Sequence, residues 1–482
     1  MQTPSNQPHA APGPLAAAAV FLAGACAFLQ LYCTQPLLPL FTSIFHVTKA
    51  SAGLTVSAAT MAVAISAPFF GALTERLARR RVILASILGM AIPTLLAATS
   101  QSLTQLIVWR FLQGVMVPGV VAVLVTYIGE EWPPNRVPFI MSLYVSGTAL
   151  GGFLGRLTAG LLADWFSWRV SFLALGLASF AGAAAVAAWL PHGRPRPTSR
   201  FSRPGARDLP VGGAGFSAYK GQAETGRVLQ VAKKGGNLYE SGEEHPSAAK
   251  AGSDSAELMY ELKPVPFTES SFSPGCLAPK GGHLPQVRAL FRLPRLVATF
   301  AVGFNVLFSL VGVFTWITFH LAAPPFSLST AALSSLFFVY LVGLLVTPVA
   351  GYLITRTSLR AGIAGAMLLS MLGVLLTLAP SLVVVILGLA LMSSGVFIAQ
   401  TASQSFLRVA TPAGSRVTGA GLYMSCYYLG GTAAGVVPAI FWSVGKWPAC
   451  VAFILFAQTL ALAIALFSWR AAKPAEFIPE TA

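Results

Sequence analysis

Charged residues are rare in this chain: 10% of its 482 residues are Asp, Glu, Lys or Arg, whereas 55% are hydrophobic. The apolar residues come in runs of about twenty, the length that an α-helix needs to cross a hydrocarbon core of about 30 Å. Soluble globular domains balance apolar and charged residues more evenly. The shortage of charge therefore excludes a soluble protein and predicts one that crosses a membrane many times.

Acids are the scarcer charged group, with 15 Asp and Glu against 31 Lys and Arg. Outside a central polar stretch, none of the acids lies in the middle of an apolar run; they are Glu75, Glu130, Glu131, Asp164, Glu476 and Glu480. A carboxylate inside the membrane is the usual carrier of a proton or partner of a cation. Its absence argues against a cationic ligand held by a central carboxylate.

The sequence also has few groups that could hold a metal or a nucleotide. Its five cysteines have no paired or metal-ligand spacing, and most lie in apolar segments as small packing groups. No Walker-type phosphate loop is present, which disfavours ATP-driven pumping. The apolar runs lack clustered His, Asp, Glu or Cys, which disfavours an enzyme. We therefore expect no metal, nucleotide or prosthetic group.

Twelve apolar segments divide into two sets of six. The first set lies at about 15–41, 51–73, 82–99, 103–127, 138–162 and 168–190, and the second at about 296–322, 329–354, 361–379, 381–405, 416–442 and 447–469. The first segment is too long for a secretory signal and lacks the basic residues that precede one, so we interpret it as a transmembrane helix. The prediction is an all-α membrane protein of twelve transmembrane helices in two six-helix bundles, at 15–190 and 291–470.

Basic residues collect on alternate loops. One set of loops carries Arg76, Arg79, Arg80, Arg81, Arg136, Arg356, Arg360, Arg408 and Arg416, whereas the opposite loops hold little beyond Lys49, Arg169 and Lys446. Loops rich in Lys and Arg stay in the cytoplasm. Both terminal tails, 1–14 and 471–482, are therefore expected in the cytoplasm. The stretch 191–290, rich in Gly, Pro, Ser, Lys and Glu, is expected to be a disordered cytoplasmic linker; the alternative is a regulatory or partner-binding insert.

A repeat relates the two halves. YVSGTALG, from Tyr144 to Gly151, is similar to YLGGTAAG, from Tyr428 to Gly435, 284 residues later. The loop that begins at Gly71 has a thinner copy 280 residues later, at Gly351. Two similar offsets from independent stretches predict a duplicated six-helix unit, the plan by which many transporters build two halves that move about a central site.

The stretch GALTERLARRR, from Gly71 to Arg81, resembles a loop of the major facilitator superfamily: a glycine, a hydrophobic residue, an acid, a base and a basic cluster between the second and third helices. Part of this pattern recurs at Gly351, although Thr355 stands at the acidic position. The resemblance implies a cytoplasmic gate made of Gly71, Glu75, Arg76, Arg79, Arg80, Gly351 and Arg356. The acid would pair with cations and helix N-termini across the seam between the halves. The simpler alternative is that the arginines only set membrane orientation.

Two further stretches are similar to motifs of the same family. WRFLQG, from Trp109 to Gly114, looks like the fourth-helix motif, and its Arg110 needs a polar partner or a wet cavity unless it reaches the interface. GTALGGFLGR in the fifth helix resembles the glycine-rich motif of the exporters. Its glycines at every fourth position predict close helix packing, together with their counterparts in the second half; they are Gly147, Gly151, Gly155, Gly431 and Gly435. Arg156 follows them, with Asp164 as a possible partner.

The polar and aromatic residues of the apolar segments are the candidates for a central cavity. They are Tyr32, Gln35, Arg110, Gln113, Arg156, Asn305, Gln400, Gln404, Tyr427 and Tyr428. For each, the alternative is a hydrogen bond between helices. The prolines Pro36 and Pro39 indicate either a hinge or a helix end near the outer end of the first segment.

The resemblance implies a secondary transporter of the bacterial inner membrane that exports a small molecule by alternating access around a site near the bilayer midplane. The alternatives are uptake of a small anionic or neutral metabolite, and a membrane sensor that transports nothing. The expected partners are the lipid bilayer and a small-molecule substrate, with or without a coupling proton. No nucleic acid is expected, and the chain is expected to be monomeric.

Overall fold

The computed structural model describes residues 12–133, 135–191, 283–342, 346, 359–412 and 415–469; the side chains of 71–76, 283–286 and 417 are excepted. Every element in these ranges is a helix. The first half contains α1 (Pro14–Leu31), the 3-10 turn η1 (Gln35–Leu37), α2 (Leu38–Ile44), α3 (Lys49–Arg76), α4 (Arg79–Ala97), α5 (Leu103–Glu131), α6 (Val137–Trp165) and α7 (Trp168–Trp189). The second half contains α9 (His283–Phe291), α10 (Pro294–Ala322), α11 (Thr330–Ser335), the 3-10 turn η4 (Leu336–Phe338), α13 (Leu359–Leu376), α14 (Leu382–Ala410), α15 (Arg416–Val436) and α16 (Pro438–Ser468).

Local sequence signals mark where several helices begin. The hydroxyl of Ser102 accepts a hydrogen bond from the backbone of Gln105 at the start of α5, and Ser167 and Ser329 cap α7 and α11 in the same way. Such caps satisfy amide groups that have no partner inside the helix. Helices α1, α10 and α16 begin instead with proline, which has no amide hydrogen to leave unpaired.

Among the described residues, ten helices are long and apolar enough to cross a membrane. They correspond to ten of the twelve predicted segments. The eleventh predicted segment contains α15, which is not among these ten helices. The eighth begins with α11, and its second part lies outside the described residues. The predicted linker, 191–290, also lies outside them apart from its two ends, and its last residues belong to α9.

Two predicted segments are interrupted. The first, 15–41, is divided because α1 ends at Leu31 and the chain continues as η1 and α2. A proline at position 36 would clash with the carbonyl of residue 32 in a continuous helix. The eleventh, 416–442, is divided in the same way, since α15 ends at Val436, two residues before Pro438. The chain bends again at Gly445 and Lys446, where the backbone is not helical.

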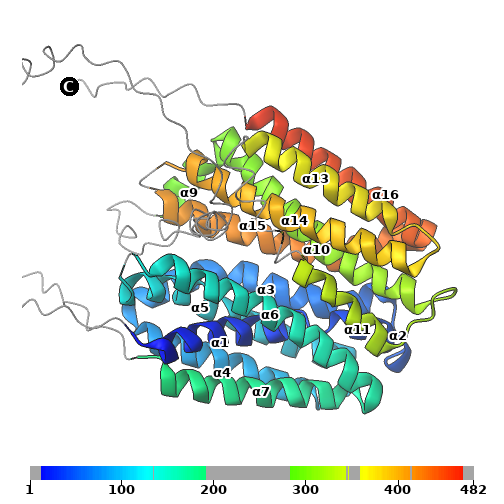
Figure 1. Ribbon diagram of the computed structural model, residues 1–482, viewed down its shortest axis with the longest axis horizontal. Coiled ribbons are helices and arrows are strands. Elements are labelled where there is room, and N and C mark those ends of the chain that lie inside the picture. Colours follow the sequence, from blue (N-terminus) through cyan, green and yellow to red (C-terminus); the bar gives the residue numbers. More distant parts are fainter. Residues whose placement is uncertain are drawn as a thin grey trace, which may run out of the picture. The chain divides into compact units, whose positions relative to one another are not determined.

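Both halves belong to one compact unit and repeat the same helix pairs. Helix α1 packs on α6 and α7 as α10 packs on α15 and α16, and α4 packs on α5 and α7 as α13 packs on α14 and α16 (Figure 1). This correspondence extends over the described helices of each half and matches the repeat seen in the sequence.

Small residues allow the closest of these contacts. Gly147, Gly151 and Gly155 lie one helical turn apart on α6 and face the backbone of α1, where a Cβ atom on each would overlap the carbonyl oxygens of Phe21, Ala25 and Leu29. In the second half, Gly430 of α15 faces Phe304 of α10 in the same way, and its neighbour Gly431 faces Leu307. Helices in lipid associate mainly through such packing, because apolar side chains gain little from leaving an apolar solvent.

We expect Gly155→Ala to destabilise the protein, because the added methyl group would collide with the backbone of α1. Forcing an extra carbon into a packed core costs about 1–3 kcal/mol, so the apparent Tm in detergent should fall by several degrees. Thermal unfolding followed by size-exclusion chromatography measures this. Gly365→Ala is the matched control, since a Cβ atom there meets open space. Equal Tm values for the two variants would contradict the packing described here.

Candidate functional site

The two halves meet through α3 of the first and α15 of the second, which lie side by side (Figure 1). Near the start of α3, Gly53 approaches the backbone of Gly435, at the end of α15. One turn further along α3, the hydroxyl of Ser57 donates to the carbonyl of Thr432 at 2.7 Å, and the hydroxyls of Thr60 and Thr432 are 3.2 Å apart. These contacts lie in the part of the molecule nearer to Lys49, Arg169 and Lys446, which we call the Lys49 end. The other end, which carries Arg79, Arg80, Arg136, Arg360, Arg408 and Arg416, is called the basic end.

Further contacts between the halves also lie toward the Lys49 end. The ammonium group of Lys49 lies 4.9 Å from the ring centre of Trp442 and 5.9 Å from that of Phe319. The rings of Phe153 and Phe338 are 4.7 Å apart, and Gly160 of α6 packs against α11. The halves are thus closed against each other at the Lys49 end.

Arg156 lies at the boundary of the two halves inside a box of aromatic rings. Its guanidinium carbon is 4.7 Å from the ring centre of Tyr32, 4.7 Å from that of Tyr340 and 5.0 Å from that of Phe337. Tyr32 belongs to the first half, and the other two rings belong to the second. Only 3% of Arg156 is exposed, so its charge depends on these rings and on a few hydrogen bonds. A cation over an aromatic face is attracted by the ring quadrupole.

Gln35 connects Arg156 to the opposite half. Arg156 Nε donates to Gln35 Oε1 at 2.7 Å, and Gln35 Nε2 donates to Thr315 Oγ1 of α10 at 3.2 Å. Gln35 and Thr315 are 280 residues apart, the offset of the repeated loop. Two residues related by a twofold axis can touch each other only near that axis, so this hydrogen bond lies close to the pseudo-twofold axis of the molecule.

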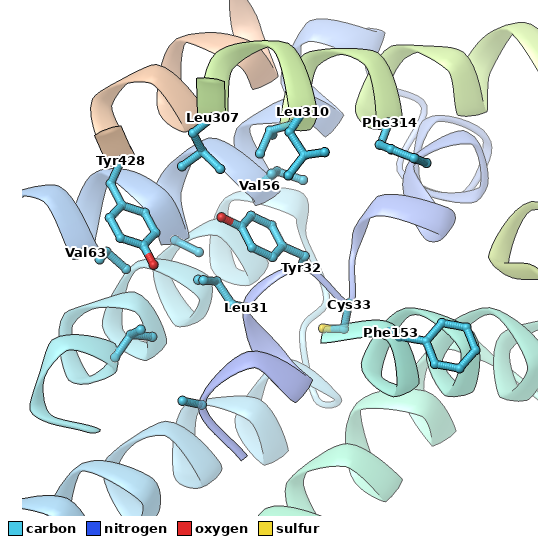
Figure 2. Packing of buried hydrophobic residues seen from close by; sticks show 14 of the residues in the cluster. Leu31, Tyr32, Cys33, Val56, Val63, Phe153, Leu307, Leu310, Phe314 and Tyr428 are labelled. Carbon is cyan, nitrogen blue, oxygen red and sulfur yellow. The ribbon is translucent and has the colours of Figure 1, made fainter. Parts of the chain in front are cut away.

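Tyrosines extend the box toward α15. Figure 2 shows the rings of Tyr32 and Tyr428 between the helices of the two halves, with Leu307 and Leu310 of α10 nearby. The ring of Tyr427 contacts that of Tyr428 at 5.4 Å in an edge-on arrangement.

A small cavity of about 20 Å³ continues from Tyr428 toward the basic end. It is lined by residues of α3, α5 and α15, namely Val63, Ala67, Val117, Pro118, Val121, Ala122, Gly421, Met424 and Tyr428. This volume is enough for about one water molecule. A larger ligand would therefore need the two halves to move apart there.

Arg110 is placed quite differently, inside the first half and fully buried. Its guanidinium donates to the carbonyls of Gln30 (2.7 Å), Thr55 (3.2 Å) and Leu31, and to the side chain of Gln113. The carbonyls of Gln30 and Leu31 end α1, where helical partners are missing and the helix dipole is negative. Arg110 therefore caps the broken first helix and does not reach water.

Gln113 extends this cap into a polar network. Its amide nitrogen donates to Gln30 Oε1 at 2.7 Å and to Thr94 Oγ1 at 2.6 Å, and Gln30 in turn donates to Ser179. The network joins α1, α4, α5 and α7. Arg110 and Gln113, predicted as cavity residues, are thus internal to the first half in this structure.

The other predicted cavity residues lie apart from the aromatic box. Asn305 is buried on α10 and accepts a hydrogen bond from Ser309 of its own helix at 3.3 Å. Gln400 and Gln404 are half-buried on α14. The structure therefore brings together Tyr32, Gln35, Arg156, Tyr427 and Tyr428 from the predicted set.

One suggested partner was wrong. Arg156 binds Gln35 rather than Asp164, because Asp164 lies eight residues further along α6, about 12 Å by helical rise, and is exposed. The sequence analysis also missed three members of the box: Thr315, Phe337 and Tyr340. The repeat offset could have identified Thr315 from Gln35, whereas nothing distinguishes Phe337 and Tyr340 within the apolar stretch LFFVYLVG.

Of the predicted gate residues, Arg79 and Arg80 are described. Arg79 forms an ion pair with Glu130 at the end of α5, at 2.5 Å. Arg80 donates to two carbonyls at the C-terminal end of α7, that of Ala187 at 2.5 Å and that of Leu190, the residue after the helix, at 2.8 Å. These bonds tie together helix ends within the first half. Gly351 and Arg356, and the side chains of Glu75 and Arg76 together with the contacts of Gly71, lie outside the described part, so the gate stays a prediction.

We expect Arg110→Met to destabilise the protein by roughly 3 kcal/mol or more, since each carbonyl left without its donor in a dry core costs about 1–3 kcal/mol. The measurement is the apparent Tm in detergent. Arg136→Met serves as the control because Arg136 is exposed at the basic end. A Tm of Arg110→Met equal to that of the control would show that the cap on α1 is dispensable.

Comparison with known proteins identifies the family. The sequence profile of the Major Facilitator Superfamily matches residues 20–435. "Uncharacterized MFS-type transporter YybF" of Bacillus subtilis is 29% identical over 456 residues, covering 94% of this chain and 93% of that protein. "Inner membrane transport protein YnfM" of Escherichia coli is 40% identical over 184 residues, 38% of this chain and 44% of that protein.

Among solved structures, a bacterial homolog of the human lysosomal transporter Spinster, in an inward-facing and unoccupied conformation, matches with a TM-score of 0.66 at 13% identity. The match covers 94% of this chain and 97% of that one, and it shows the same fold. The chain thus belongs to the major facilitator superfamily: it is an all-helical, multi-pass membrane transporter and not an enzyme.

Proposed function

We propose that this chain is a secondary active exporter of the bacterial inner membrane, with both termini in the cytoplasm. The observation that carries the proposal is the uneven contact between the halves. They are joined at the Lys49 end by Ser57, Thr60 and Thr432, whereas a cavity lies between them toward the basic end. Since loops rich in Lys and Arg face the cytoplasm, this arrangement corresponds to a state closed toward the outside.

In alternating access, the contacts at the Lys49 end break while the halves close at the basic end. Between the described residues of the two halves, the hydrogen bonds that cross the boundary involve hydroxyl groups. Breaking them does not require separating opposite charges. Each half keeps its own internal network, which for the first half includes Arg110 and Gln113. Such a division suits two rigid bodies that rock about the aromatic box.

The proposal that the chain exports its substrate, and does not take it up, is based on the fifth-helix stretch GTALGGFLGR, which resembles the motif of exporters. Counterflow into proteoliposomes from a panel of sugars, organic anions and amphiphilic drugs, with and without a pH gradient, tests for transport and for a coupling proton. Inside-out vesicles should then accumulate the transported compound against its gradient. If folded protein shows counterflow with none of the compounds in the panel, this result would count against the proposal.

Locking the halves together at the Lys49 end should stop transport. We expect Thr60→Cys combined with Thr432→Cys, in a background without other cysteines, to form a disulfide on oxidation because the two hydroxyls are 3.2 Å apart. The oxidised protein should lose counterflow, and dithiothreitol should restore it.

The control is a cross-link inside one half. Gly182→Cys places a thiol beside Cys26, and both residues belong to the first half. That disulfide should leave counterflow intact if the halves move as rigid bodies. Transport that persists through the Thr60–Thr432 cross-link would rule out alternating access through this boundary.

Orientation can be tested in intact cells. Lys446 and Arg136 are both exposed, at opposite ends of the molecule. We expect a membrane-impermeant maleimide to label Lys446→Cys but not Arg136→Cys, each in a cysteine-free background. Permeabilised cells, in which both should react, provide the control. The reverse pattern would invert the assignment of the closed side.

A further inference from the structure

Two buried arginines of the first half differ in how their charge is compensated. Arg110 meets three backbone carbonyls and the end of a helix dipole. Arg156 meets one carbonyl, that of Gly152 at 2.6 Å, and the amide oxygen of Gln35. A charge removed from water is unfavourable unless it is paired and fully hydrogen-bonded. Arg110 is satisfied by the fold, whereas Arg156 is satisfied only in part.

No carboxylate of the described chain compensates Arg156. The side chains around the guanidinium are the aromatic rings of Tyr32, Phe337 and Tyr340. Within the described residues, its Nε and Nη1 atoms donate hydrogen bonds and Nη2 has no acceptor. The guanidinium thus presents a positive charge and a donor that the protein leaves unused.

A second donor lies beside it. The hydroxyl of Tyr340 is buried and has no hydrogen-bond partner among the described residues, although the Tyr340 ring is in contact with the guanidinium. Buried hydroxyls are nearly always bonded, so an unbonded one marks a group with a missing partner. Arg156 and Tyr340 come from opposite halves, and within the described chain each has a hydrogen-bond donor without an acceptor at the boundary between them.

We propose that Arg156 and Tyr340 bind the carboxylate of an organic anion, which is the transported substrate. A carboxylate matches the planar fork of a guanidinium and accepts shorter and stronger hydrogen bonds than an amide does. The rings of Tyr32, Phe337 and Tyr340 surround the charge, and the cavity beyond Tyr428 is lined mainly by apolar side chains. These surfaces favour an anion with an apolar or aromatic body over a small inorganic ion. The inference rests on the proposed function for the claim that the bound anion is carried.

The same contacts relate the anion site to the boundary between the halves. A carboxylate at Arg156 competes with Gln35 Oε1, the present acceptor of Nε. Through its Nε2 atom, Gln35 also donates to Thr315 of the opposite half, so a change at Gln35 acts on a contact that crosses the boundary. The anion site and the contact between the halves therefore share Gln35.

The experiment measures ligand-induced shifts in Tm with a panel of aromatic and aliphatic monocarboxylates, each paired with its neutral carboxamide. For the native protein, we expect at least one carboxylate to raise the Tm while its carboxamide does not. Arg156→Gln should remove that shift, and Arg156→Lys should reduce it, because lysine keeps the charge but loses the planar fork. Arg136→Gln, which removes an exposed cation at the basic end, should keep the full shift.

A merely structural role for Arg156 makes different predictions. It would lower the ligand-free Tm of Arg156→Gln, as expected for Arg110→Met, and leave the carboxylate shift of Arg156→Lys at the native size. Tyr340→Phe is a second variant that preserves the ring and removes only the unbonded hydroxyl. It should weaken the carboxylate shift without lowering the ligand-free Tm. A native shift in both Arg156→Lys and Tyr340→Phe would overturn the proposal.

The outcomes separate this inference from the proposed function. Counterflow of sugars or cationic drugs, without any carboxylate shift, would overturn the anion site and leave the transporter intact. A carboxylate shift that depends on Arg156, in protein that shows no counterflow of that carboxylate, would support the binding site and contradict its role in transport. Equal shifts from carboxylate and carboxamide would also overturn the site, since they would show that charge is not recognised.

Discussion

Backbone polar groups inside a bilayer must find partners within the protein, and this constraint acts at the end of α1. The helix stops at Leu31 in the interior, so its last carbonyls have no helical partners. The guanidinium of Arg110, reaching from α5, supplies the donors. Because this cap stabilises the break, the chain beyond it can turn and place Tyr32 and Gln35 at the boundary between the halves.

The boundary itself is made of weak contacts around the buried charge of Arg156. Hydroxyl groups and glycines join α3 to α15, and aromatic rings from both halves surround Arg156. A transporter needs a boundary that can be opened repeatedly, so weak and exchangeable contacts suit it. A partly compensated cation in the same place favours binding of an opposite charge. The rigid interior of each half and the exchangeable boundary between the halves are thus two separate features. Helix α1 and the turn η1 contribute residues to both.

Much of the fold could be predicted from the sequence, because apolar runs and their breaks are local. Ten of the twelve segments appear as long apolar helices among the described residues, and the glycines of α6 lie against α1. The interruption after Leu31 was the less predictable feature. Pro36 and Pro39 are compatible with a kink or an end, and the donors that satisfy the freed carbonyls of α1 come from α5, about eighty residues away in the sequence. Asp164 was the wrong partner for Arg156, because eight residues along one helix separate two positions by about 12 Å.

The sequence by itself determined that this protein is a doubled set of membrane helices without a central acid, because hydropathy, loop charge and repeats need no knowledge of distance. Only the tertiary structure decided which of two similar arginines would be capped and which would be left with donors to spare. Arg110 and Arg156 both lie within apolar segments, and their neighbours in sequence do not separate them. Their difference comes from residues distant in the chain: the carbonyls that end α1 in one case, and the rings of Phe337 and Tyr340 in the other. Packing brings those groups together, and a local sequence pattern cannot show which distant residues will be in contact.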